Sequence, residues 1–127
     1  MDAFYEIFYC ASVTRCYPGR GASGRGDRTP APREVALCRF WREWELLLLR
    51  PRLLVPVGGL ALRELLGVSR VSACVGRTYE LGDAVAIPLP HPSGASGWLN
   101  DRSNRTRLER ALVAVRVRVA GLGPSTA

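Results

Sequence analysis

The sequence predicts an α/β fold with a short parallel sheet. Residues 53–57 (Leu-Leu-Val-Pro-Val) form a continuous apolar run, which is typical of a buried parallel strand. Gly58-Gly59 follows and leads directly into a helical segment over residues 60–66, which ends at Gly67. A strand, a glycine turn and a helix in this order make one half of a β-α-β unit. Val85, Ile87 and Leu89 then alternate as a second strand.

A longer helix is expected over residues 32–49. Proline is tolerated in the first turn of a helix, and Glu34 suits the positive end of the helix dipole. Pro51 ends the segment. The apolar side chains recur every three or four residues, so we expect one face of this helix to pack on the sheet. That face consists of Leu37, Phe40, Trp44 and Leu47, widened by Cys38 and Trp41.

The remaining segments complete the prediction. The aromatic and β-branched residues 4–13 are predicted to form a strand, and the glycine- and proline-rich residues 17–31 a flexible loop. Residues 70–83 are expected to form a short β excursion that turns at Gly82-Asp83. Residues 103–118 are predicted as a helix capped by Asn104, although Val113 to Val119 also alternate as a strand would. Residues 1–119 thus form one domain, and 120–127 a disordered tail.

The charge of the chain favours a polyanionic partner. The 127 residues carry a formal net charge of +7, and every basic residue is an arginine. Guanidinium groups bind phosphate with two parallel hydrogen bonds, so nucleic acid is the first partner expected. GC-rich coding is the competing explanation for the arginine content. No secretory signal or membrane span is evident, and the cysteines lack a disulfide pattern, so we expect a cytoplasmic protein that contacts no membrane.

The one histidine of the chain is the strongest candidate for chemistry. His91 lies between Pro90 and Pro92, directly after the apolar strand of residues 85–89. In open α/β sheets, ligands bind outside the carboxyl ends of the strands. A histidine in a proline-rich turn is most often an ordinary exposed loop residue. A functional role for His91 therefore depends on the residues around it.

Three segments of the chain occur together in a recognisable order. The first is residues 13–19 (Val-Thr-Arg-Cys-Tyr-Pro-Gly) with residues 27–30 (Asp-Arg-Thr-Pro), Glu34 and Cys38. The second is residues 51–58 (Pro-Arg-Leu-Leu-Val-Pro-Val-Gly) with Ala61, and the third is His91-Pro92-Ser93. Together they resemble the uracil-DNA glycosylases, most closely their iron–sulfur branch (family 4 and its relatives). The resemblance spans about residues 5–118 and corresponds to the C-terminal two-thirds of the family.

The resemblance implies a three-layer α/β/α sandwich and the hydrolysis of the N-glycosidic bond of uracil in DNA. It implies that His91 faces the uracil carbonyl and stabilises the departing base, while Ser93 binds a DNA phosphate. The base must first be turned out of the duplex stack. Trp98 and Leu99 could fill the vacated space or pack in the core. The other residues that it places against DNA are Ser12, Arg15, Arg28, Pro92 and Gly94.

The chain also departs from the family pattern. The family's first active-site segment, its first strand and helix, and its first pair of cluster cysteines are expected to lie upstream of the residues present here. Ser12 stands where the family often has an asparagine that reads the uracil edge. Cys16 and Cys38 match the second pair of cluster cysteines, so a [4Fe-4S] cluster would need further thiolates. Cys10 and Cys74 are expected to be buried thiols that act as small apolar side chains.

Two other functions fit the same residues. A catalytically inactive DNA-binding remnant of the fold would keep the arginines but would release no uracil. A small interaction protein would instead use Trp41, Trp44 and Trp98 as an exposed patch. A sheet without its first strand would also leave an exposed edge, which favours self-association.

Overall fold

The computed structural model describes residues 2–24, 26–68, 70–93 and 97–122. The chain divides into two compact units, residues 8–50 and residues 1–7 with 51–127, and each is described by itself. The first unit contains α2 (Pro32–Leu49). The second contains α1 (Asp2–Ile7), β1 (Leu53–Leu54), α3 (Gly59–Leu66), α4 (Val71–Cys74), β2 (Tyr79–Leu81), β3 (Ala84–Ala86), η2 (Trp98–Asn100) and α5 (Arg102–Leu122).

The sheet has three strands in the order β1-β3-β2. β1 pairs with β3 in parallel, with Leu53 opposite Val85, and β2 pairs with β3 antiparallel. The parallel register continues to the isolated bridge between Val57 and Leu89. The amide of Leu89 donates to the carbonyl of Pro56 at 2.9 Å, and the amide of Gly58 donates to the carbonyl of Leu89 at 3.0 Å. The predicted parallel pair is therefore confirmed, in a mixed α/β fold with a small sheet.

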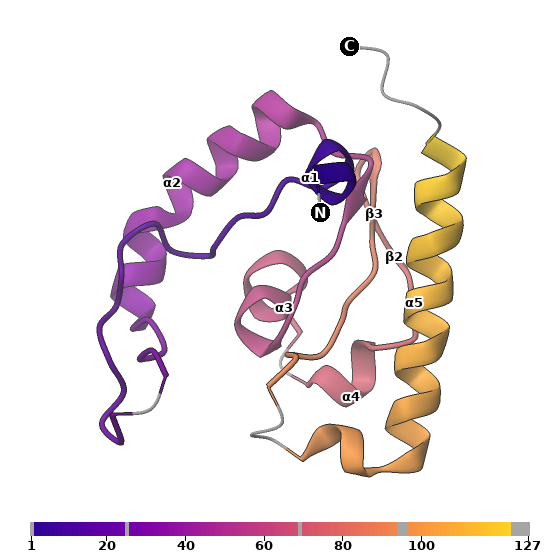
Figure 1. The fold of residues 1–127 in the computed structure, drawn as a ribbon. Helices are drawn as coiled ribbons and strands as arrows, with labels where there is room; N and C mark the ends of the chain where they lie inside the picture. The colour runs from indigo at the N-terminus through magenta and orange to yellow at the C-terminus, as the bar shows by residue number, and fades with distance from the viewer. Residues whose placement is uncertain (1, 25, 69, 94–96, 123–127) are drawn as a thin grey trace. The chain divides into compact units, whose positions relative to one another are not determined.

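The core of this unit lies between β3 and α5 (Figure 1). Val75, Ile87 and Ala111 are buried together, and Ala114 and Val115 of α5 pack against them. Burying a side chain such as that of Ile87 contributes about 1.5–3 kcal/mol relative to leaving it in water. Small residues on α5 allow the helix to approach the sheet closely. This packing holds in place the end of the sheet from which the residues after β3 continue.

α3 follows the prediction closely. It begins at Gly59, one residue earlier than expected, and its only fully buried side chain among the described residues is that of Leu62. It ends at Gly67, which adopts a left-handed conformation with φ 69°. Its preceding residue, Gly58, has φ 85° and ψ 169°, a conformation that only glycine adopts without strain. The Gly58-Gly59 pair therefore allows the chain to turn from strand into helix within two residues.

The final helix is confirmed, but its cap was wrongly predicted. Asn104 lies inside α5, where its side-chain amide donates to the carbonyl of Trp98 at 2.9 Å. Asp101 precedes the helix instead, and its Oδ1 accepts from both the amide and the hydroxyl of Ser103, at 2.7 and 2.6 Å. The helix continues through Leu122, so the predicted tail begins three residues too early. Residues 123–127 lie outside the described residues.

One strand prediction was wrong, and the predicted β excursion over residues 70–83 was correct only for β2 and the turn that follows it. Within residues 4–13, the part up to Ile7 forms the short helix α1 and the remainder is irregular. Phe4, Tyr5 and Ile7 are exposed, because the segment pairs with no strand, and β propensity alone does not hold a strand in water. Residues 71–74 form the helical turn α4 rather than a strand, whereas Gly82-Asp83 is the expected turn between β2 and β3.

The other unit consists of an irregular segment and α2. The helix has the predicted bounds, but its buried residues are Val35 and Cys38, and Cys38 alone belongs to the predicted apolar face. Five of the six predicted face residues are exposed: Leu37, Phe40, Trp41, Trp44 and Leu47. The loop over residues 17–31 closes into a hairpin-like turn, with a bridge between Arg20 and Asp27. None of the helices in the described ranges is long and apolar enough to span a membrane.

Candidate active site

His91 lies where the parallel strand pair ends. The ladder between residues 52–58 and 85–89 runs up to the amide of Gly58, and His91 follows two residues after the last bridge. Pro88 and Pro90 are buried, while His91, Pro92 and Ser93 are exposed. The loop is therefore anchored by two buried prolines and presents the imidazole to solvent at the carboxyl edge of the sheet. This is the position that the sequence predicts for it.

Two hydrogen bonds orient the His91 ring. The backbone amide of Ser93 donates to Nδ1 at 3.1 Å, and the Ser93 hydroxyl lies 2.8 Å from the same nitrogen. An amide can only donate, so Nδ1 must offer its lone pair. In the neutral imidazole the proton is then assigned to Nε2. The loop thus turns His91 into a hydrogen-bond donor through Nε2.

Gly58 packs against the His91 side chain. A Cβ atom at this position would lie 3.4 Å from Cδ2 and 3.5 Å from Cβ of His91. The start of α3 and the His91 ring are therefore in close proximity. The sequence analysis places Gly58 in the turn after the buried strand and in the family-like segment, but it does not predict this contact. A glycine directly after a buried strand is the signal for such a close approach.

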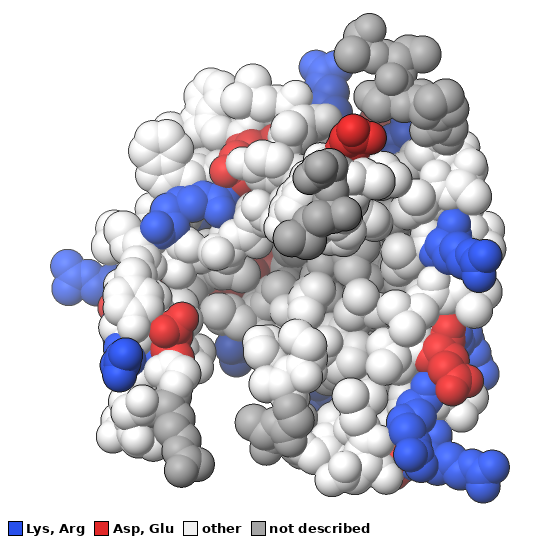
Figure 2. Space-filling view, in the orientation of Figure 1, with Lys and Arg blue, Asp and Glu red and all other residues white. Residues whose placement is uncertain are grey.

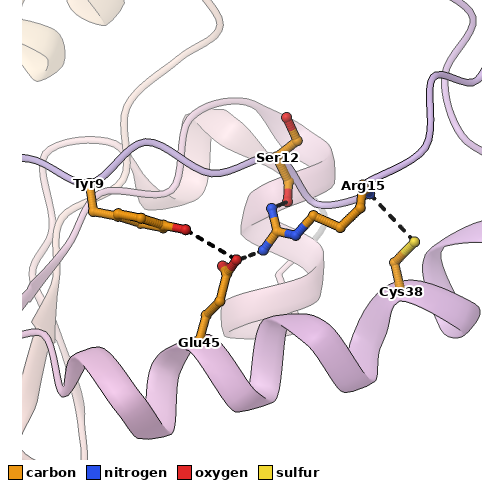
Figure 3. Close-up of polar contacts among 5 residues, drawn as sticks. All are labelled: Tyr9, Ser12, Arg15, Cys38 and Glu45. Carbon is orange, nitrogen blue, oxygen red and sulfur yellow. Dashed lines mark hydrogen bonds and ion pairs between the residues drawn. The ribbon is translucent and has the colours of Figure 1, made fainter.

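The predicted DNA contacts Ser12 and Arg15 lie in the unit of residues 8–50, where a polar cluster joins them to α2 (Figure 3). The Arg15 guanidinium donates to the carbonyl of Ser12 at 2.8 Å and forms an ion pair with Glu45. The hydroxyl of Tyr9 donates to the same carboxylate at 3.2 Å. The cluster fastens the irregular segment to α2 and gives Arg15 a partner within the protein.

Arg28 is held in a similar way at the start of α2. Its guanidinium donates to Glu34 at 2.6 Å and to the carbonyl of Pro18 at 2.8 Å. Glu34 also accepts from the amide of Ala31 at 2.8 Å. The hydrogen bond from Arg28, with that from Ala31, lowers the pKa of Glu34. Both charged side chains are about two-fifths exposed, so the Arg28 guanidinium remains open to a further anion.

The cysteines do not form a complete cluster site. Cys38 is buried, and its Sγ lies 3.5 Å from the amide of Arg15, the residue before the exposed Cys16. Cys38 therefore lies next to the segment that carries Cys16. Cys74 is buried as expected, whereas Cys10 is exposed, because its segment does not form the predicted strand. Within the described ranges, however, no three His, Cys, Asp or Glu side chains gather where they could hold a metal. Two thiols do not fit a [4Fe-4S] cluster, which uses four.

A comparison with protein families identifies the superfamily of the chain. The family model of the uracil DNA glycosylase superfamily matches residues 2–114. The chain belongs to the uracil DNA glycosylase superfamily. No curated protein matches it. Because this superfamily acts on DNA, membership favours the nucleic-acid partner expected from the arginine content.

Within this superfamily member, the structure groups the predicted site residues in two sets. His91, Pro92 and Ser93 share one loop, and Gly94 lies outside the described residues. Ser12, Arg15, Arg28, Cys16 and Cys38 belong to the other unit. Trp98 is half-buried against the core and its Nε1 donates to the Ser72 hydroxyl at 3.3 Å, which favours packing over insertion into DNA.

Proposed function

We propose that the protein hydrolyses the N-glycosidic bond of uracil in DNA and that His91 is its catalytic hydrogen-bond donor. As this bond breaks, the sugar gains positive character and the uracil departs with negative charge. A fixed donor aimed at a uracil carbonyl oxygen stabilises charge that develops mainly in the transition state. The Nε2–H of His91 would be this donor.

The observation that carries the proposal is the hydrogen bonding of Nδ1. The Ser93 amide donates to Nδ1 at 3.1 Å, so the proton of the neutral ring stays on Nε2. No change of tautomer is then needed before the reaction. The buried Pro88 and Pro90 limit the movement of the loop. A donor that is already oriented needs little reorganisation when charge appears.

In the proposal, the start of α3 also stabilises the negative charge that develops on the departing uracil. The first amides of a helix have no acceptor within it, and its dipole places partial positive charge there. Because Gly58 lies against the His91 ring, this end of α3 is close to the place where the uracil oxygen would be bound. Two independent sources of positive potential thus meet at the carboxyl edge of the sheet.

The remaining predicted residues would bind the substrate. In the proposal, Pro92 and Ser93 bind a DNA phosphate next to the base that has been turned out of the stack. Arg15 and Arg28 add salt-sensitive affinity for the backbone. Within the superfamily we place the chain nearest to the iron–sulfur branch on account of Cys16 and Cys38, but no step of the proposed reaction depends on a cluster.

The test is to replace His91 by alanine and measure excision and binding separately. Removing one donor to a developing oxyanion reduces turnover by about 100- to 1,000-fold in other enzymes, and we expect a loss of this size here. Uracil release is measured in single turnover with excess protein, and DNA binding by fluorescence anisotropy. We expect binding to change by less than about threefold, since the lost bond forms mainly in the transition state.

Thr78→Ala is the matched control, because Thr78 is exposed and lies outside the loop. It should leave both quantities unchanged. An equal loss of excision and binding in His91→Ala would show that the role assigned to His91 is wrong. Binding of uracil-containing DNA without any release of uracil by the unaltered protein would favour the DNA-binding, non-catalytic alternative.

A further inference from the structure

The outer surface of α5 carries an unusual amount of unpaired positive charge. The helix contains six arginines and one acidic residue, Glu109. Arg107 is directed inward and donates to the carbonyl of Ser72. The other five side chains are exposed, and within the described part of the chain none has a hydrogen-bond or ion-pair partner for its guanidinium: Arg102, Arg105, Arg110, Arg116 and Arg118.

The five guanidinium groups without a partner contribute no hydrogen bond or ion pair to the fold of the described chain, so folding does not account for their presence on α5. The inner face of α5 is fixed by Ala111, Ala114 and Val115 against the core. At 3.6 residues per turn, Arg102, Arg105 and Arg116 lie on the opposite, exposed arc of the helix, and Arg110 lies at its edge. Arg118 follows Ala114 by one turn and therefore lies on the inner side, beyond the core. Figure 2 shows arginine side chains at the right-hand edge of the visible face, over α5. Because Glu109 is the one acid on the helix, little of this charge is neutralised locally.

We infer that the exposed arc of α5 binds the DNA backbone beyond the target nucleotide. This inference rests on the proposed function for its choice of partner, and it adds a second contact surface to the His91 loop. α5 begins at Arg102, a short distance along the chain from Ser93, and the core fixes it beside β3 (Figure 1). From Arg102 to Arg116 the helix extends about 21 Å at roughly 1.5 Å per residue. That length corresponds to about six base pairs of duplex at roughly 3.4 Å each.

The pattern of side chains favours nucleic acid over a membrane surface. Leu112, Val113 and Val117 are also exposed on α5, but they alternate with the arginines around the same arc. A helix that lies in a lipid interface needs its apolar side chains gathered on one face, so that they can be buried together. A guanidinium group also pairs with phosphate in a planar, bidentate geometry.

The experiment compares the salt dependence of DNA binding among three single variants. Arg105→Gln and Arg116→Gln each remove one charge from the arc. Arg52→Gln is the matched control, since Arg52 is exposed and precedes β1, at the end of the parallel strands opposite to His91. Binding to a uracil-containing duplex and to the same duplex without uracil is measured between about 50 and 300 mM salt. Circular dichroism checks that each variant remains folded.

Each phosphate contact contributes about 0.9 to the slope of log affinity against log salt. We expect Arg105→Gln and Arg116→Gln each to reduce the slope by about this amount on both duplexes, and to weaken binding roughly eightfold at 0.1 M salt. Arg52→Gln should change the slope by less than half as much.

The outcomes separate this inference from the proposed function. If the protein releases no uracil but the slopes change as expected, the contact surface stands and the catalytic proposal fails. If the slopes for Arg105→Gln, Arg116→Gln and Arg52→Gln are equal, the inference is wrong whatever the excision activity. Loss of binding to vesicles rich in phosphatidylserine, with an unchanged DNA slope, would assign α5 to a membrane surface and overturn it.

Discussion

Among single residues, Gly58 offers a direct test of how the His91 ring is positioned. Its backbone, at φ 85° and ψ 169°, is strained for any other residue by about 1–3 kcal/mol. An added methyl group would lie 3.4 Å from the His91 ring, so relaxation of this strain would shift the imidazole. We expect Gly58→Ala to reduce uracil release by about 10- to 100-fold, because small displacements of a catalytic group are costly.

Gly67→Ala is the control for this substitution. Gly67 also has a positive φ, 69°, but nothing lies within 4 Å of an added Cβ atom. Both variants should therefore lose stability in urea unfolding, by roughly 1–2 kcal/mol for Gly67→Ala. Only Gly58→Ala should lose excision activity at a temperature where both are folded. Equal activity of the two variants would show that Gly58 does not position His91.

At the scale of secondary-structure elements, the start of α2 should respond to acid through Glu34. The hydrogen bond from Arg28, and then that from the Ala31 amide, lower the pKa of this carboxyl from its usual 4.5. A group whose pKa is lowered in the folded state stabilises it above the unfolded pKa, and this contribution is lost as the pH falls through the folded value. We expect the stability of this unit to fall below about pH 4.5 for that reason.

Glu34→Gln keeps the size of the side chain but removes its titration. The variant should be less stable than the unaltered protein near pH 7, and the two should approach each other as the pH falls toward 2. The measurement is the midpoint of urea unfolding, followed by circular dichroism at 222 nm across this range. Parallel pH profiles for the two proteins would contradict the role assigned to the ion pair with Arg28.

At the scale of the whole molecule, the buried cluster of Val75, Ile87 and Ala111 should determine whether the sheet and α5 stay together. Ile87 is 1% exposed, and truncation of such a side chain to alanine costs about 2–5 kcal/mol. We expect Ile87→Ala to lower the free energy of unfolding by this amount, measured in urea, and Ile87→Val by about 0.5–1.5 kcal/mol. A loss under about 1 kcal/mol for Ile87→Ala would show that this cluster is not the main core.

The predictions that succeeded came from segments whose local pattern and tertiary setting agree. The apolar run of residues 53–57, the Gly58-Gly59 turn and the helix up to Leu66 carry their own start and stop signals, and the structure confirms them. The position of His91 after the second parallel strand was also predictable, because Pro90 and Pro92 allow no continuation of the ladder. Membership in the uracil DNA glycosylase superfamily was similarly evident from the motifs.

The predictions that failed depended on partners that a single segment does not reveal. Residues 4–7 have strand composition, but no neighbouring strand pairs with them, and a helix satisfies the backbone locally. Asn104 was chosen as a cap by residue type, whereas Asp101 accepts the two Ser103 hydrogen bonds that cap α5. The outward direction of Leu37 and Trp44 on α2 could not be read from periodicity, which defines a face but not what covers it.

Local backbone preference and composition are enough to predict the strand–turn–helix unit, the excess of arginine and the histidine between prolines. Three further features appear only in the folded chain: Gly58 lies against the His91 ring, and the Ser93 amide directs the proton to Nε2. The third is that, within the described part of the chain, five arginines of α5 have no partner for their guanidinium groups. These are relations in space between groups, several of them distant along the chain, and their geometry exists only once the segments have packed.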